Sequence, residues 1–239
     1  DMRSALTAAA IATSVAPVAE AQSRSVFGEA RMSSSLHDRG EQLSAETLEL
    51  LLGLEQSTAF GAVYTSIYRI EPIGPTAGAF ASETDYSIGV IVEEDTFSAD
   101  LSANWLTYPG SEDDSTLELA LSIDIVGTLS PNLSAFYDAH TSDKGFEVSA
   151  GPSIEMGAWT TNLRGRAGMV SIGDGSPNRS YAGIEVSSSR AVADNWEFGV
   201  HASIDAANRE TFSASIRQGE IVSFEHQGVS AGISLSYTN

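Results

Sequence analysis

The sequence contains no cysteine and only one lysine, Lys144, among its 239 residues. The absence of cysteine excludes disulfides, thiolate nucleophiles and Cys-ligated zinc. Basic residues are scarce, since 12 Lys and Arg stand against 32 Asp and Glu and give a formal net charge of −20. A chain this acidic lacks the basic face that nucleic-acid binding requires, and the polybasic patch that docks on anionic lipid.

Long apolar runs are also missing. No stretch reaches the roughly 18 consecutive apolar residues that a membrane-spanning helix needs. At the start, Met2-Arg3 precedes a small and apolar run over 5–18 and then Ala19-Glu20-Ala21. This order of a basic residue, an apolar core and an A-x-A site is typical of a secretory signal peptide. We therefore expect a signal peptide over 1–21 and an exported domain over 22–239.

What the exported part does contain is alternation. Between Phe97 and Trp105, every second residue is apolar and the residues between them are polar. A period of two sustained over nine or more residues indicates half-buried strands. Twelve such segments are expected, at 26–37, 47–56, 59–70, 79–92, 96–107, 115–127, 132–141, 145–155, 158–170, 180–188, 195–205 and 227–237. The segment 47–56 is the weakest and could also form a short helix.

The connections between these segments alternate in length. In order they hold 9, 2, 8, 3, 7, 4, 3, 2, 9, 6 and 21 residues. Short turns at one end and longer loops at the other are typical of an up-and-down antiparallel transmembrane β-barrel of the outer membrane, with both termini at the tight-turn end. The longest connection, 206–226, could hold its own hairpin, pairing Thr211–Arg217 with Glu220–Glu225.

The charges keep to the polar face of the segments. In a barrel that face lines the lumen, whereas in a soluble sandwich the apolar face would be buried between two sheets. Aromatic residues on the apolar face favour the barrel, because they gather near the two strand ends, where a bilayer has its interfaces. The expected pore-lining residues are Arg31, Arg69, Arg164, Arg166, Asp100, Glu118, Asp124, Asp138, Glu147, Glu185, Glu197 and Asp205. The aromatic residues in question are Phe60, Phe97, Trp159, Trp196 and Tyr237 at one end, and Tyr68, Phe80, Trp105 and Phe146 at the other.

Several stretches resemble the TorF-like porin family of proteobacterial outer membranes. They are 33–40 with 48–54, then 59–64, then Trp105-Leu106-Thr107-Tyr108-Pro109-Gly110 and Leu129-Ser130-Pro131-Asn132-Leu133-Ser134. The resemblance spans most of the exported part and implies a single-chain outer-membrane β-barrel. The chain departs from the pattern at its end, where Tyr237-Thr238-Asn239 stands in place of a terminal aromatic residue.

Signals of catalysis and of cofactor binding are weak. The four histidines lie outside metal-binding spacings. His37, His140 and His201 share the polar face and could approach one another, and a Ser/His/Asp arrangement remains open among so many serines. The run Glu112, Asp113 and Asp114 is a solvated loop or a weak divalent-cation site. We expect no enzyme, no cofactor and no resident metal.

The sequence therefore predicts a narrow porin of the Gram-negative outer membrane, through which small hydrophilic solutes diffuse passively. An excess of carboxylates in the lumen predicts a preference for cations. Its expected partners are outer-membrane lipid and the transported solutes, and homo-oligomers are common in such proteins by analogy. Two alternatives stay open: a non-conducting surface or structural barrel that binds a partner through its loops, and a soluble exported β-sandwich. The lumen could be open, gated or plugged.

Overall fold

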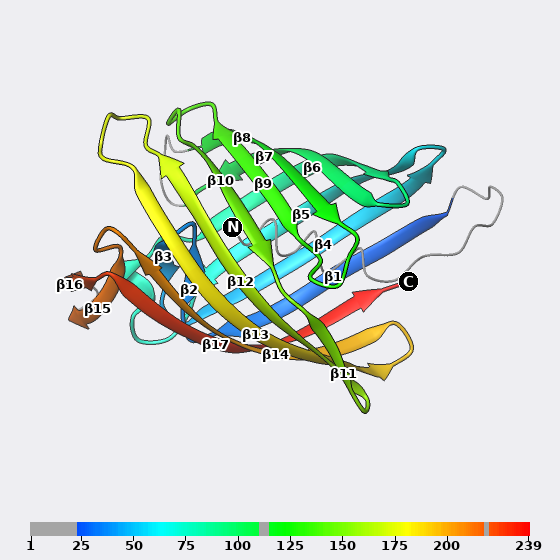
Figure 1. Ribbon diagram of the computed structural model, residues 1–239. Coiled ribbons are helices and arrows are strands. Elements are labelled where there is room, and N and C mark those ends of the chain that lie inside the picture. The colour runs from blue at the N-terminus through cyan, green and yellow to red at the C-terminus, as the bar shows by residue number, and fades with distance from the viewer. Residues whose placement is uncertain (1–22, 110–114, 218–219) are drawn as a thin grey trace.

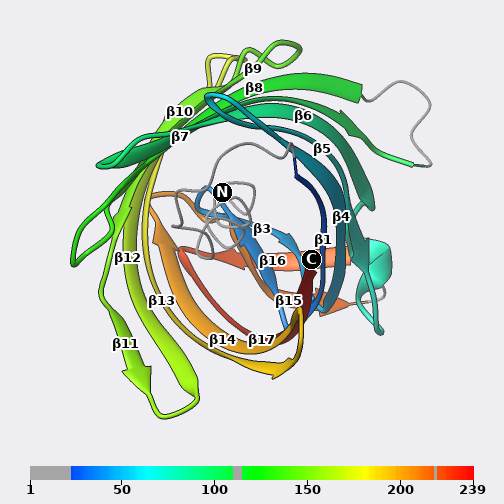
Figure 2. The ribbon, with the colours of Figure 1, turned by 90° about the vertical axis from the view of Figure 1, so that its right-hand side faces the viewer.

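The computed structural model describes residues 23–109, 115–217 and 220–239. One antiparallel sheet runs around the molecule and closes on itself through the pairing of β10 with β12. Figure 1 shows the strands side by side along the barrel, and Figure 2 shows the ring they form. A closed twelve-strand barrel confirms the predicted fold class and excludes the sandwich, which needs two separate sheets. The expected signal peptide, 1–21, lies outside the described residues.

The barrel strands follow one another in chain order around the ring. They are β1 Arg24–Ser33, β4 Thr47–Thr58, β5 Gly61–Pro72, β6 Glu83–Glu93, β7 Phe97–Thr107, β8 Ser115–Ile125, β9 Asn132–Asp138, β10 Lys144–Ala150, β12 Trp159–Ser171, β13 Arg179–Ala193, β14 Trp196–Ala207 and β17 Gln227–Thr238. A short strand, β11 Ser153–Met156, continues β10 after the break at Gly151-Pro152 and pairs with β12. The segment 47–56 is therefore a strand and not a helix.

Two hairpins and one short helix occupy the longer loops. The hairpin β2 Leu36–Asp38 with β3 Glu41–Ser44 follows β1, so the first strand ends at Ser33 rather than at residue 37 as expected. The hairpin β15 Phe212–Arg217 with β16 Glu220–Glu225 confirms the one predicted in 206–226. A 3-10 turn, η1 Ala77–Ala79, lies between β5 and β6. No helix in the described residues is long and apolar enough to cross a membrane.

The outer face of the barrel is apolar and the inner face is polar. Along β4, for example, Leu50, Leu52 and Leu54 are exposed, whereas Glu49, at an alternate position of the same strand, is 2% exposed. Because successive side chains on a strand point to opposite faces, the exposed apolar set is the outer wall and the alternate set faces the lumen. The inverted arrangement, with apolar side chains outside, is what separates this fold from a soluble protein with a packed core.

Inward glycines make room for large side chains in the lumen. A side chain at Gly53 would collide with the ring of Phe27, and one at Gly89 would collide with the ring of Tyr64. Each glycine therefore lets a neighbouring ring lie flat on the wall instead of standing upright in the passage. The lumen keeps its width while the rings cover the glycine backbone.

Candidate functional site: the constricted lumen

A hairpin folded inward is the central feature of the lumen. Figure 2, which looks along the barrel, shows β3 within the outline of the ring, and the contacts of the β2–β3 hairpin with β8, β9 and β14 place it inside the wall. The β2–β3 turn is built by Arg39 and Gly40, whose φ angles are 48° and 76°. Two central residues with positive φ form the tight turn that suits a two-residue hairpin, and Gly40 adopts this conformation without strain. Arg39 adopts it at some cost, which its contacts with the wall offset.

One side of this hairpin is held by apolar contacts. Leu36 packs with Tyr68 and Ile70 of β5, and Leu43 and Leu51 border the same cluster. Leu36 is 4% exposed. This cluster fixes the hairpin against the β4–β5 wall, since several apolar side chains of both meet there.

The other side is held by a hydrogen-bonded chain. His37 Nδ1 lies 3.0 Å from Asp205 Oδ2 on β14, and His37 Nε2 lies 2.8 Å from Ser35 Oγ. Arg166 of β12 donates to the second carboxylate oxygen of Asp205, with Nη2 at 2.6 Å. Phe212, at the start of β15, covers the imidazole edge-on with ring centroids 5.0 Å apart. Two barrel strands, β12 and β14, and the outer hairpin thus meet at His37 of the inner hairpin.

The order Ser35, His37 and Asp205 is that of a Ser-His-Asp triad, and the two distances fit one. Its surroundings do not. Ser35 and His37 are both buried, and Ser35 also lies within 3.3 Å of the Ser44 carbonyl oxygen. A nucleophile needs open space for a reacting carbonyl next to its oxygen, and Ser35 is enclosed by its own hairpin. The Ser/His/Asp arrangement left open by the sequence is therefore present, and its hydrogen bonds anchor β2 to the wall.

The tip of the hairpin reaches the wall opposite β1 and β4. Arg39 donates to Glu118 of β8 at 2.7 Å, and its guanidinium carbon lies 3.3 Å from the ring centroid of Phe136 on β9. Arg179, the first residue of β13, pairs with Glu41 and donates to the Arg39 carbonyl oxygen at 2.8 Å. Burial raises the pKa of Glu41, and the adjacent Arg179 guanidinium opposes that rise. The hairpin therefore crosses the lumen and narrows it.

The outer hairpin is bonded to the inner one. The backbone N–H of Gln42 donates to the Thr211 carbonyl oxygen at 3.1 Å, and the Ser213 N–H donates to Gln42 Oε1 at 2.8 Å. Thr211 Oγ1 also donates to the Gly40 carbonyl oxygen. A displacement of β15 would be transmitted to β3 through these bonds.

Of the twelve residues expected in the pore, the barrel places eleven on the inner face. They are Arg31, Arg164, Arg166, Asp100, Glu118, Asp124, Asp138, Glu147, Glu185, Glu197 and Asp205, each at the alternate position to an outward neighbour. Arg166 on β12 pairs with Asp205 on β14, two strands away. It reaches across because Gly183, between them, has no side chain that would occupy this space.

Arg69 is the exception, and its expected place in the pore is wrong. It pairs in register with Leu50, which faces outward, and it bonds to Glu71 and to Thr84 Oγ1 on the same outer face. The inward positions of β5 include Tyr64, Tyr68 and Ile70 instead. The prediction for this strand was wrong because its tyrosines were counted as apolar and placed on the outer face. Their hydroxyl groups instead donate to lumen carboxylates, Tyr68 to Glu49 and Tyr64 to Asp100.

The remaining histidines do not assemble. His201 on β14 lies 3.3 Å from Ser33 Oγ, and His140 is exposed in the loop after β9. No group of three or more His, Cys, Asp or Glu side chains in the described residues could hold a metal ion. The acids Glu112, Asp113 and Asp114 lie outside the described part of the chain.

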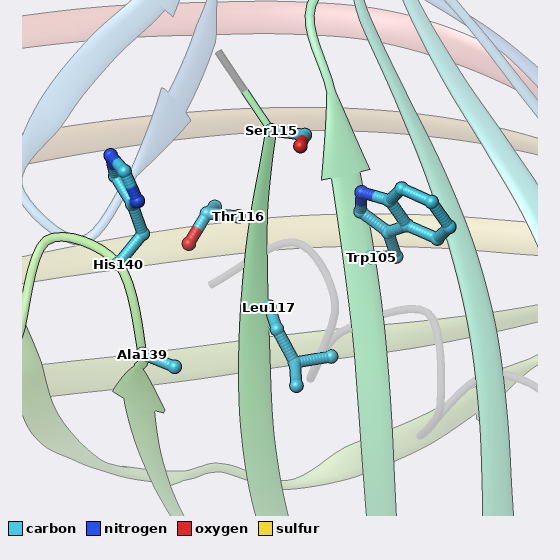
Figure 3. A pocket seen from close by; sticks show the side chains of 6 residues that line it. All are labelled: Trp105, Ser115, Thr116, Leu117, Ala139 and His140. Atoms are coloured by element: carbon cyan, nitrogen blue, oxygen red, sulfur yellow. The ribbon is translucent and has the colours of Figure 1, made fainter. Parts of the chain in front are cut away.

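A hollow of about 480 Å³ lies outside the lumen, near the loop ends of β7 and β8. Figure 3 shows Trp105 and Leu117 on one side of it and His140 on the other. Trp105 and Leu117 are exposed partners on the outer face. The hollow therefore borders the outer wall at the loop ends of β7 and β8.

No protein-family model matches the sequence, and no curated protein matches it. The fold has solved counterparts. An outer-membrane channel from Pseudomonas putida F1 has a TM-score of 0.52 at 9% identity, covering 95% of this chain and 100% of that chain. The KdgM porin, solved in complex with disordered oligogalacturonate, has a TM-score of 0.51 at 9% identity, covering 89% and 98%. Identity this low shows a shared fold alone, and the resemblance to TorF-like porins stays a prediction.

Proposed function

We propose that this chain is an outer-membrane porin through which small hydrophilic solutes diffuse passively, with a preference for cations. The observation that carries the proposal is the combination of a closed barrel, an apolar outer wall and a lumen rich in carboxylates. The outer wall is what hydrocarbon lipid requires, and a closed ring leaves no strand edge without a partner. By the usual arrangement of such barrels, the long-loop end faces the cell exterior and the tight-turn end faces the periplasm.

The charge of the lumen supports a cation preference. Eight carboxylates and three arginines of the expected set face inward, as described above. Glu55, Asp124 and Glu197, all toward the tight-turn end, form no ion pair with a cationic side chain in the described residues. Uncompensated carboxylates in a narrow aqueous passage raise the local cation concentration and repel anions.

The inward hairpin supports a narrow passage. Twelve strands would enclose a lumen wider than the largely filled interior of an eight-strand barrel. The β2–β3 hairpin, with its tip on Glu118 and Phe136, divides that space near the long-loop end. We therefore assign solute size selection to the gap between this hairpin and the wall.

The test is single-channel conductance of the refolded protein in a planar bilayer with a salt gradient across it. Discrete current steps with a reversal potential on the cation-selective side support the proposal. Steps with anion selectivity would retain the pore and refute the role of the carboxylates. Heat-dependent gel mobility gives an independent check that the barrel has folded, so that an absence of steps can be interpreted.

A second candidate is a non-conducting surface barrel that binds a partner through its loops. The observation that favours it is the same hairpin, because a plug held by contacts on both sides could close the lumen completely. A folded barrel that inserts into the bilayer and passes no current in any salt would decide for this candidate over the porin.

A further inference from the structure

Three side chains form a row on the outer wall near the tight-turn end. Arg190 on β13 pairs in register with Phe198 on β14. On its other side, the guanidinium of Arg190 lies over the ring of Trp159 on β12, 5.2 Å from the centroid. Trp159 and Phe198 in turn meet edge-on at 6.3 Å. The cation thus lies over one aromatic ring, which a second ring from the strand on the other side of β13 meets edge-on.

This row faces away from the lumen. Phe198 pairs with Leu235, an exposed apolar residue of the outer wall, and residues paired across an antiparallel ladder share a face. Trp196 and Tyr237 form the register pair two residues closer to the strand ends, and their ring centroids are 5.0 Å apart. Arg190 therefore lies in a belt of aromatic residues of the kind that marks the level of lipid headgroups.

Arg190 differs from two other outward arginines of the barrel wall. Arg24 on β1 pairs in register with Gln56 and donates to its Oε1 at 2.9 Å. Arg69, near the long-loop end, has Glu71 as its counter-ion. Arg190 is exposed, its ring contact is with Trp159, and no described carboxylate forms an ion pair with it. A cation on a lipid-facing wall is costly without a negative partner. The anionic group available at this depth is the phosphate of a phospholipid headgroup.

We infer that Arg190, with Trp159 and Phe198, forms a binding site for the phosphate of a phospholipid in the periplasmic leaflet. The Trp159 ring holds the guanidinium by a cation–π contact, with Phe198 edge-on to that ring, and the N–H groups can donate to phosphate oxygens. Acyl chains of the same lipid would lie along the apolar wall above the row, over Val186 and Ile184. The inference rests on the proposed function in one respect, that the barrel spans a membrane.

The site is tested by native mass spectrometry of the refolded, delipidated barrel with phosphatidylglycerol added. The probe for comparison is diacylglycerol with the same acyl chains, which lacks the phosphate. We expect the wild type to retain phosphatidylglycerol over diacylglycerol and Arg190→Gln to lose about fivefold in that retention. Arg217→Gln, which removes an exposed arginine from β15 at the opposite end, is the matched control and should retain lipid as the wild type does.

Equal retention by Arg190→Gln and the wild type would overturn the site. So would full displacement of the lipid by inorganic phosphate, because that result assigns the site to a free anion. Conductance and heat-dependent mobility are recorded on the same samples. If Arg190→Gln conducts normally and binds lipid normally, the result contradicts only the lipid site. If the wild-type protein fails to insert into bilayers, the result contradicts the proposed function itself.

Discussion

Toward the long-loop end of the lumen, charged side chains meet partners of opposite sign, whereas toward the tight-turn end the carboxylates stand without them. Arg39 meets Glu118, and Arg166 meets Asp205, at the level of the hairpin. Glu55 and Glu197, near the other end, have no such partner in the described residues. The same residue types therefore perform two tasks: the paired ones build a constriction, and the unpaired ones set the potential of the passage that leads from it.

Removal of the constriction is the largest test of this comparison. Replacing 36–44 by a short Gly-Ser linker should raise single-channel conductance several-fold, because the wall behind the hairpin becomes the limiting width. The cation preference should persist, since the carboxylates near the tight-turn end remain. As a control, shortening the loop 174–177 should leave conductance unchanged. Unchanged conductance after loss of the hairpin would place the constriction elsewhere.

The anchor at His37 should carry much of the stability of the hairpin. His37→Ala removes one hydrogen-bond partner of Ser35 and one of Asp205 Oδ2, and it leaves a cavity beneath Phe212. We expect a loss of about 2–4 kcal/mol in the free energy of unfolding, measured by denaturant titration in micelles. His226→Ala is the control, because His226 is exposed and its ion-pair contact with Glu210 is long, at 3.7 Å, and lies at the surface. Similar losses in both variants would refute the anchor.

Much of this architecture follows from the alternation of the sequence. Strands such as Phe97–Thr107 show a period of two in their sequence because one face of the barrel wall is apolar and the other is polar. The strand Thr47–Thr58 looked helical in part, since its leucine run hides the inward Leu51 and Gly53. Pairing with β1 and β5 makes this segment a strand. Such pairing cannot be seen in the sequence of one segment alone.

The constriction could not be predicted in this way. The β2–β3 hairpin has strands of three and four residues with a register shift between them, too short to show a period. Its position depends on contacts with residues such as Asp205 and Glu118, far away in the chain. The one local signal was Arg39-Gly40, since a glycine after a polar residue suits a tight hairpin turn. Arg69 was misplaced for a related reason, because tyrosines count as apolar in a pattern while their hydroxyl groups face the lumen.

A glycine inside the ion-pair network gives the next test. A methyl group at Gly183 would collide with the Asp205 carboxylate and lie 3.1 Å from Arg166 Nε. Gly183→Ala should therefore cost about 1–3 kcal/mol in the free energy of unfolding. Gly165→Ala, on the outer face, would meet only the Ala150 carbonyl oxygen at 3.9 Å and should stay within about 0.5 kcal/mol of the wild type. Equal effects would show that the paired network does not limit the stability of the wall.

Charge selectivity is the direct test of the unpaired half of the lumen. Arg164, which donates only to the Ser130 carbonyl oxygen among its described partners, can be changed without breaking an ion pair. Arg164→Glu should raise the cation-to-anion permeability ratio about twofold, and Glu55→Gln should lower it by a smaller factor. Reversal potentials under a salt gradient report both, with Glu220→Gln on the outer hairpin as control. Shifts of opposite sign to these would assign selectivity to the paired half instead.

A contact outside the lumen should matter least. Thr76 Oγ1 donates to Glu46 at 2.6 Å, and this bond holds the pKa of Glu46 below its ordinary value. A carboxyl whose pKa is lowered by folding stabilises the protein above its ordinary pKa, and this contribution is lost as the pH falls through the lowered value. Thr76→Val should cost only about 0.5 kcal/mol near neutral pH, because solvent screens the exposed loop, and the difference should vanish in acid.

Thr76→Ser, which keeps the hydroxyl group, should restore wild-type stability, as followed by denaturant titration at several pH values. A loss in Thr76→Val as large as that of His37→Ala would mean that the loop around Glu46 supports the hairpin as strongly as the lumen does. Since Glu46 directly precedes β4 and lies two residues after β3, such a result would move the support of the constriction from the ion pairs inside the barrel to its rim. The expected small effect follows from the exposure of that rim, where water replaces a lost hydrogen bond at little cost.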